Sequence, residues 1–519
     1  MNSKLNNDAV TYIQSKQYRR ATLILNKALL ISKYGGKCHV FETSPLRRET
    51  AEMRTADEYI SSDCFTSMLL EEEQEPLDED YDEGMNTFLD PYNIPSTKSD
   101  SNEFTKMVLC YNLGIVHLKS RNNEDALAYF DKAWSDDTTL QSMHDSGVSM
   151  VCSFDAQEKI ALMHNLAYSY FRCDHFTESL MFYDKALDLA LQAYGYFHIS
   201  VSMTLNCIGV VRLHSFDAKK GSDDILGLFM ESIAINEAIS STKCQYRAMN
   251  ATILNNIGRV QFARKEYHEA KARYEESYRI RVALYGPMHI DVAAVLYNIG
   301  EVQQILGFSE EAIALYQKFL SIVTVHLGRR DFDVAVIFKK IAQIYYERAE
   351  SEKAIEMYLK ALDIVKSCLG ETHSEVTSIL NKIGNICYRR QEYDIALKVY
   401  EEGLKIERQI LDHDHPNIIT TTINIARIHH QLGNLDQALV LHDEALTMQR
   451  ENCLTKADRI NIACTLSSIG LINDQRKQYW LAIDAFEEAL NIRTEELGVD
   501  HFDISSTLNV SFLCYIVRT

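Results

Sequence analysis

Histidine recurs at one place in a short pattern along the chain, and imidazole is a common metal ligand and proton carrier. The recurring histidines are His198, His289, His373, His415 and His501, and four of them follow a Tyr-Gly or Leu-Gly pair by three residues. No third ligand at helical spacing accompanies them, and Gly-x-Ser-x-Gly, Gly-x-Gly-x-x-Gly and His-Glu-x-x-His are absent. We therefore interpret them as structural residues at helix starts. We expect no metal, no cofactor and no catalysis.

Asparagine forms a second series, and its amide can donate and accept a hydrogen bond at once, which suits a peptide group. Each of these asparagines lies two or three residues before a small residue that recurs along the chain. The candidates are Asn165, Asn206, Asn255, Asn298, Asn381 and Asn424. We predict that they bind a partner; the alternative is that they are solvated helix residues or local caps.

Basic residues occupy equivalent places in the middle of the chain. They are Arg259, Lys339, Lys340, Lys382 and Arg427. On an acidic chain, a track of cations can pair with carboxylates of a ligand, which predicts an acidic peptide. The alternative is that these are surface residues that balance nearby glutamates.

A regular array of helices must position these side chains, and the pattern Ala-x-x-x-Tyr-x-x-Ala indicates such an array. Its first Ala and its ring return every 42 residues from Ala270 to Ala438, where His442 stands in place of the last Tyr, and a Gly or Ala lies twelve residues before each first Ala. A small residue lets two helix backbones approach closely. The first Ala of the pattern, the ring four residues later and the residue seven later form one stripe along a helix. Gly286, Gly328 and Gly370 suit helix ends. The sequence predicts an all-α, right-handed superhelical solenoid of helix-turn-helix repeats, with an extended surface rather than one deep pocket.

Composition excludes several classes of protein. The chain has 519 residues and a net charge of −20, which argues against nucleic acid or an anionic membrane as partner. Its 12 cysteines form no Cys-x-x-Cys, so neither a zinc site nor a disulfide framework is indicated. No signal peptide or membrane span is visible, and we expect a cytoplasmic protein.

The chain divides into four predicted parts. They are an N-terminal, repeat-like helical pair (1–34), an acidic and disordered insertion (35–103), an array of about nine repeats (104–500) and a cap or truncated repeat helix (501–519). Residues 71–83 of the insertion hold nine acids and no base. This acidic run is either a solvated linker or a tethered ligand that docks within the same molecule.

The small residue, the ring and the paired alanines resemble the tetratricopeptide repeat over about residues 104–510. The 42-residue step and the recurring Leu/Tyr-Gly-x-x-His linker are similar to the kinesin light chain type of that repeat. The resemblance implies that the first helix of each pair lines a concave groove, where the Asn and basic series would bind an extended peptide. Kinesin light chains carry a long coiled coil before their repeats, and this chain has no sustained heptad pattern there.

The expected function is that of a non-catalytic scaffold or adaptor, which binds extended peptide segments of a protein partner in the concave groove. Two alternatives stay open. One is a kinesin light chain-like adaptor that links cargo to a motor, and the other is a regulatory subunit that modulates an enzyme in trans.

Overall fold

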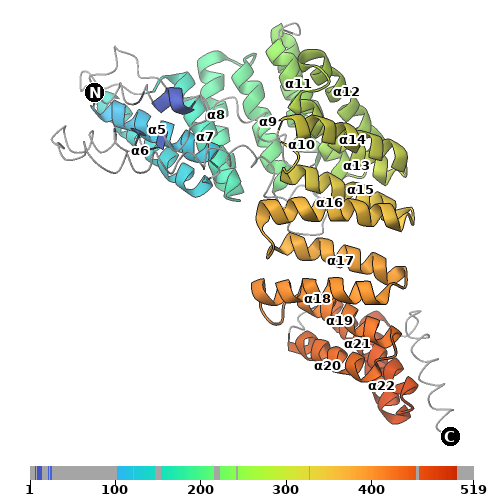
Figure 1. Ribbon diagram of the computed structural model, residues 1–519. Coiled ribbons are helices and arrows are strands. Elements are labelled where there is room, and N and C mark those ends of the chain that lie inside the picture. The colour runs from blue at the N-terminus through green and yellow to red at the C-terminus, as the bar shows by residue number, and fades with distance from the viewer. Residues whose placement is uncertain are drawn as a thin grey trace, which may run out of the picture. The chain divides into compact units, whose positions relative to one another are not determined.

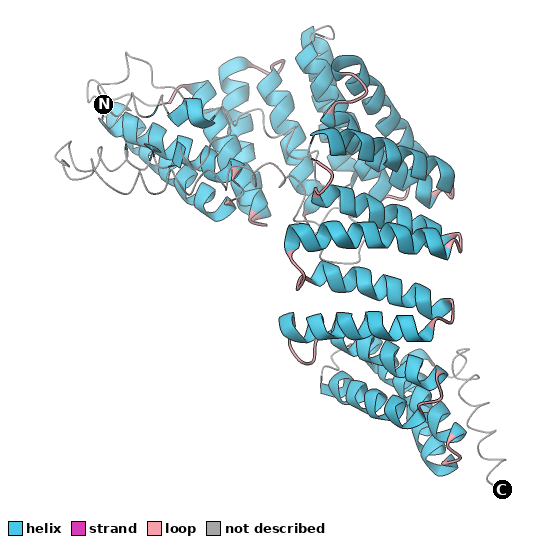
Figure 2. Cartoon of the chain, in the orientation of Figure 1, coloured by secondary structure: helices cyan, strands magenta, loops and turns pink. Residues whose placement is uncertain are grey.

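The computed structural model describes residues 102–120, 122–145, 154–215, 222–240, 244–326, 328–451 and 455–498, with residues 6, 9–13, 21, 22, 24, 25 and 28 near the N-terminus. Every regular element in these ranges is an α-helix (Figures 1 and 2), so the predicted all-α solenoid is confirmed. None of the helices in these ranges has the length and apolar character that a membrane span requires. Internal contacts divide the chain into two compact units, residues 1–322 and 323–519.

In unit 1, the helices form consecutive antiparallel pairs in which an odd-numbered first helix packs on an even-numbered second helix. They are α5 (Asn102–Lys119), α6 (Asn123–Asp145), α7 (Ala156–Arg172), α8 (Phe176–Tyr194), α9 (Ile199–His214), α10 (Ser222–Ser240), α11 (Cys244–Ala263), α12 (Tyr267–Tyr285), α13 (Ile290–Ile305) and most of α14 (Ser309–His326). Each second helix up to α12 also contacts the first helix that follows it, which is the stacking expected of a repeat array.

Unit 2 repeats the same arrangement. Its helices are α15 (Phe332–Glu347), α16 (Ser351–Leu369), α17 (Ser374–Arg389), α18 (Tyr393–Ile410), α19 (Pro416–Gln431), α20 (Leu435–Glu451), α21 (Lys456–Gln475) and α22 (Tyr479–Leu497). The contacts run α15–α16–α17 and onward to α22 without a break. Side chains also join successive first helices, since Lys339 of α15 pairs with Glu375 of α17 and Asn381 of α17 donates to Thr421 of α19 at 3.2 Å. First helices are therefore neighbours, and their exposed side chains share one face.

The recurring small residue is required by the ring of the second helix. A Cβ added to Gly258 would lie 2.6 Å from the ring of Tyr274, and one added to Gly300 would lie 2.7 Å from that of Tyr316. The first Ala of the pattern, as at Ala270, is fully buried. Because the ring fills the space above the small residue, the sixteen-residue spacing between the two fixes how the two helices of one repeat meet.

The helices begin and end at the recurring His and Gly residues, as the sequence predicts. Gly370 ends α16 with φ 91° and ψ 166°, a region that essentially only glycine occupies. His198, His289, His373 and His415 are N-caps, and the Nδ1 atom of each accepts a hydrogen bond from a backbone N–H at 3.1–3.3 Å. Their interpretation as structural residues at helix starts is confirmed for these four, while His501 lies outside the described residues.

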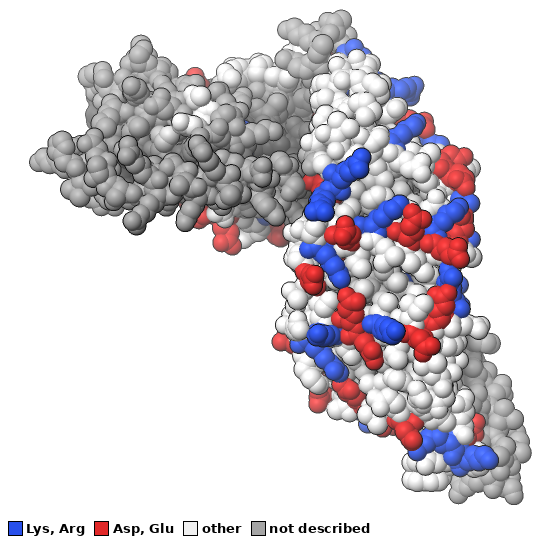
Figure 3. Space-filling view, in the orientation of Figure 1, with Lys and Arg blue, Asp and Glu red and all other residues white. Residues whose placement is uncertain are grey.

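Ion pairs link successive second helices of unit 2 at the same positions. Lys366 pairs with Glu402 at 3.1 Å, and the equivalent Arg408 pairs with Glu444 at 2.8 Å. Positive and negative side chains are interspersed over this face (Figure 3). Exposed ion pairs contribute about 0–1 kcal/mol each, so these pairs add little to the free energy of unfolding.

Parts of the predicted organisation fall outside the described residues. This is so for residues 35–101, including the acidic run 71–83, and for 501–519, so their predicted boundaries stay predictions. Within the predicted pair 1–34, Ala9, Ala21 and Ala28 are fully buried and belong to the core of unit 1.

Substituting Ala354 by Trp is expected to lower the free energy of unfolding by about 1–3 kcal/mol, because its site is fully buried beside Tyr358. Leu359→Trp is the matched control, since Leu359 lies on the same helix and is 51% exposed. Thermal unfolding followed by circular dichroism measures both variants. Equal melting temperatures would contradict the assigned repeat positions.

Candidate functional site

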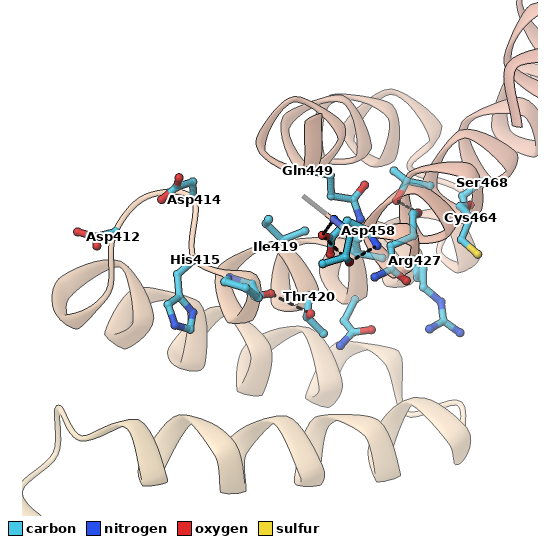
Figure 4. A pocket seen from close by; sticks show the side chains of 16 residues that line it. Asp412, Asp414, His415, Ile419, Thr420, Arg427, Gln449, Asp458, Cys464 and Ser468 are labelled. Atoms are coloured by element: carbon cyan, nitrogen blue, oxygen red, sulfur yellow. Dashed lines mark hydrogen bonds between the residues drawn. The ribbon is translucent and has the colours of Figure 1, made fainter. Parts of the chain in front are cut away.

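A cavity of about 780 Å³ lies in unit 2 between two consecutive first helices, α19 and α21 (Figure 4). Side chains of both helices and of the loops before them line it. They are Asp412, Asp414, His415, Pro416, Ile419, Thr420, Ile423, Asn424, Arg427, Gln449, Thr455, Asp458, Asn461, Cys464, Thr465 and Ser468. We call this cavity the α19–α21 pocket.

Helical spacing explains why these side chains share the pocket. Thr420, Asn424 and Arg427 stand at i, i+4 and i+7 of α19 and form one stripe. The 44-residue step to the next first helix places Cys464 and Ser468 opposite Thr420 and Asn424. The pocket thus combines amide, hydroxyl and thiol groups with a cation.

The lining also has an apolar part and a buried amide. Ile419 is buried and Ile423 is half-buried, and both lie between the polar stripe and the body of the repeat. Gln449 comes from the last turn of α20 and is 9% exposed. Its Oε1 atom has no hydrogen-bond partner within the described part of the chain.

Charge differs between the two ends of the pocket. Asp412 and Asp414 lie in the loop before α19, and Asp458 lies in the first turn of α21 (Figure 4). Asp458 forms a capping box with Thr455, whose N–H it accepts at 2.8 Å. Arg427 supplies the one Lys or Arg side chain among the described lining residues, and its guanidinium lies 5.1 Å from the ring centre of Tyr388.

Of the predicted site residues, Asn424 and Arg427 line the α19–α21 pocket. Lys382 is exposed and lines a second, smaller cavity of about 120 Å³ with Tyr346 and Tyr358. Lys339 forms an ion pair with Glu375 of the next first helix. Lys340 is half-buried on the same helix, α15.

The predicted asparagines of unit 1 lie between helices instead of on an open surface. Asn298 donates to Asn255 at 3.0 Å, and Asn256 donates to Asn206 at 3.0 Å. Asn165 donates to Tyr111 at 3.0 Å. These asparagines are at least 97% buried, so they connect successive first helices, and peptide binding by them stays a prediction.

Two further predicted residues have protein partners. Arg259 is 2% exposed, and its Nη2 atom lies 3.0 Å from Nε2 of His214. Burial, with the charge of Arg259 as a smaller cause, lowers the pKa of His214 to about 3, so this imidazole is neutral at pH 7. In unit 2, Asn381 donates to the buried Glu407 at 3.2 Å.

Sequence reasoning missed Gln449, Asp412 and Asp414, as well as the α21 side of the pocket. The signal for Cys464 and Ser468 was present, since they stand 44 residues after Thr420 and Asn424. No signal marked Gln449, because the second helix was considered only for packing. No group of three or more potential ligands for a metal ion occurs among the residues with described positions.

Comparisons with known proteins give matches at the level of family and fold. No curated protein matches the chain. Among solved structures, BtubC (BKLC) from P. vanneervenii is 18% identical with a TM-score of 0.38, covering 45% of this chain and 93% of its own. The apo form of RapI is 14% identical with a TM-score of 0.47, covering 69% of this chain and 97% of its own. Nearly identical TPR-like repeats from Podosopora anserina are 16% identical with a TM-score of 0.35, covering 39% and 96%.

Family models of the tetratricopeptide repeat match residues 160–200, 249–324, 291–367 and 375–451. The matched residues coincide with the helix pairs α7–α8, α11–α16 and α17–α20, which carry the recurring small residue and ring. Such repeats support protein–protein interaction in general. The chain is a tetratricopeptide repeat protein.

Proposed function

We propose that the chain is a non-catalytic scaffold or adaptor that holds an extended segment of a partner protein across the first helices of unit 2, with the α19–α21 pocket as its anchor. The observation that supports this best is the pocket itself. Its volume of about 780 Å³ lies in the range of ligand sites, and consecutive first helices supply its polar stripe.

The lining groups suit an extended peptide. The amides of Asn424 and Asn461 can each donate to and accept from peptide groups, because both side chains reach the surface. Ile419 and Ile423 offer apolar contact to an alternate side chain of the segment. Arg427 offers a fork of donors to a carboxylate, so the predicted acidic group of the ligand binds there.

The rest of the predicted basic track contributes less in this proposal. Lys339 already pairs with Glu375, so a ligand carboxylate would have to compete with that carboxylate. The acidic run 71–83 is proposed as an intramolecular competitor for Arg427. Deleting 71–83 should then strengthen partner binding, and unchanged affinity would remove this part of the proposal.

A random library of displayed twelve-residue peptides, selected on the full chain, tests the proposal. Selected peptides should bind Arg427→Glu and Asn424→Ala at least about tenfold more weakly, because each variant removes a group of the pocket. Lys398→Glu is the control, since it makes the same charge change on an exposed site of the second helix α18.

Cysteine alkylation gives an independent readout of the same binding. Cys464 is exposed in the pocket, while Cys368 is exposed at the end of α16, outside the lining. A selected peptide should slow alkylation of Cys464 and leave that of Cys368 unchanged, as measured by mass spectrometry. Equal protection at both sites, together with full binding to Arg427→Glu, would overturn the proposal.

The identity of the partner that co-purifies with the chain distinguishes this proposal from its two alternatives. Co-purification with a motor heavy chain would favour a kinesin light chain-like cargo adaptor. Recovery of an enzyme whose activity changes on binding would favour a regulatory subunit.

A further inference from the structure

We infer that Arg389 and Arg427 form a phosphate site on the first-helix face of unit 2, and that this site binds a phosphorylated Ser or Thr of the partner segment. The inference rests on the proposed peptide-binding function and names the group that the arginines recognise. It differs from the predicted recognition of Asp and Glu side chains, because a phosphoryl group carries more charge and more acceptor oxygens.

Each of the two arginines lies over a tyrosine ring of the preceding first helix. The guanidinium of Arg389 in α17 is 5.0 Å from the ring centre of Tyr346 in α15. The guanidinium of Arg427 in α19 is 5.1 Å from the ring centre of Tyr388 in α17. Arg389 directly follows Tyr388 in the sequence, so the two pairs are neighbours on α17. The two cations therefore follow one another across α15, α17 and α19, which is the direction of the proposed segment.

The rings hold the arginines without using their hydrogen-bond donors. A guanidinium attracted to the face of a ring keeps the N–H groups at its edge for another partner. Both arginines are exposed, and both tyrosines are half-buried. The N–H groups can therefore reach a ligand, while the contact with the ring limits the freedom that each side chain loses on binding.

Neither arginine forms an ion pair with a carboxylate among the described residues. The next residue of α17 does, since Arg390 pairs with Glu392 at 2.9 Å. Glu347, in the last turn of α15, instead accepts a hydrogen bond from Gln343 of its own helix at 2.9 Å. The first-helix face of unit 2 therefore offers two positive charges to a ligand.

A phosphorylated side chain fits two such cations better than a carboxylate does. A carboxylate has one charge and two oxygens, which a single guanidinium fork satisfies. Phosphoserine and phosphothreonine carry a charge of about −1.5 to −2 at pH 7 and three acceptor oxygens, so two forks can share one group. A phosphodiester of nucleic acid has one charge per phosphate, and the net charge of −20 on the chain repels that polymer.

Synthetic forms of a peptide selected from the displayed library test the inference with the full chain. The starting peptide is one that protects Cys464 from alkylation, and each of its positions is replaced in turn by Ser, phosphoserine or Glu. Fluorescence anisotropy of the fluorescein-labelled peptides should reveal one position at which phosphoserine binds at least about tenfold more tightly than both Ser and Glu.

Variants of the chain assign this advantage to the two arginines. Arg389→Gln and Arg427→Gln should each reduce the advantage of phosphoserine over Glu at least about fivefold, because each removes one charged fork. Both side chains are exposed, so neither substitution should lower the melting temperature. Lys398→Gln is the control, since it makes the same charge change at an exposed site of α18 and should leave the advantage unchanged.

The outcomes separate this inference from the proposed function. If Glu binds as tightly as phosphoserine at every position, or if only one of the two arginines is needed, the phosphate site is wrong and the peptide-binding function stands. If no selected peptide protects Cys464, the proposed function is wrong, and the inference is wrong with it.

Discussion

Gly384→Ala should lower the free energy of unfolding by about 1–3 kcal/mol, which is the cost of overpacking a tight contact. The new Cβ would lie 2.8 Å from Cζ of Tyr400 and 2.9 Å from two more ring atoms. Tyr400 is 1% exposed, and its hydroxyl donates to Asn385 at 2.8 Å, so the ring cannot swing aside without losing that bond. Ala342 stands sixteen residues before Tyr358 in the equivalent place, so a repeat can be built with this methyl group, which limits the cost.

Gly403→Ala is the matched control and should change stability in the opposite direction. Gly403 lies inside α18, and a Cβ there would be 3.7 Å from Oδ1 of Asn381, at ordinary contact distance. Alanine in a helix interior is about 1 kcal/mol more favourable than glycine. Thermal and urea unfolding should therefore rank the proteins as Gly403→Ala, parent, Gly384→Ala. A Gly384→Ala protein as stable as the parent would contradict the account of the recurring small residue.

The contrast between these two glycines shows what the sequence could and could not predict. Gly384 has its ring sixteen residues later, and that spacing identified both the packing contact and the fold. Gly403 stands at the last position of the same pattern, where Ala361 and Ala445 stand in neighbouring repeats, so the sequence indicates that Ala fits there, but only the structure gives the room around it. Period and residue size determine the repeat because each unit packs on the next in the same way.

Burial of the asparagines could not be predicted from spacing alone. In unit 1, an Asn three residues before the small anchor pairs with an Asn two residues before the next anchor, as in Asn255 with Asn298. In α19 the residue three before the anchor is Ile423, so the equivalent bond to α21 cannot form. Ser468 of α21 instead donates to Cys464 of its own helix at 3.2 Å. The pairing is absent earlier in unit 2 as well, since Lys339 takes the place in α15 and Asn381 of α17 donates to Glu407 and Thr421.

Lowering the pH from 6.5 toward 4 should destabilise unit 2 through His442, which stands where other repeats place Tyr or Phe. His442 is fully buried, and neither ring nitrogen has a hydrogen-bond partner in the described ranges. Burial is the main reason that the pKa of this imidazole falls to about 4 from 6.5, and the nearby His430 and Arg427 lower it further. The unfolded chain then binds the proton more readily than the folded one, so stability is full above about pH 6.5 and is lost as pH falls toward 4. A shift of this size corresponds to about 3 kcal/mol.

His442→Phe isolates this contribution. Phe130, Phe229 and Phe486 occupy the same position in other repeats, so the ring suits the site, and it does not titrate. The variant should unfold at the same or higher urea concentration at pH 7, and its advantage over the parent should grow as pH falls to 4.5. His413→Gln serves as the control because His413 is exposed in the loop before α19. The buried His164, with its pKa lowered to about 3, acts in the same direction in unit 1 of both proteins and cancels in the difference. A constant difference between parent and His442→Phe across this pH range would show that the buried imidazole is not the acid-sensitive group of unit 2.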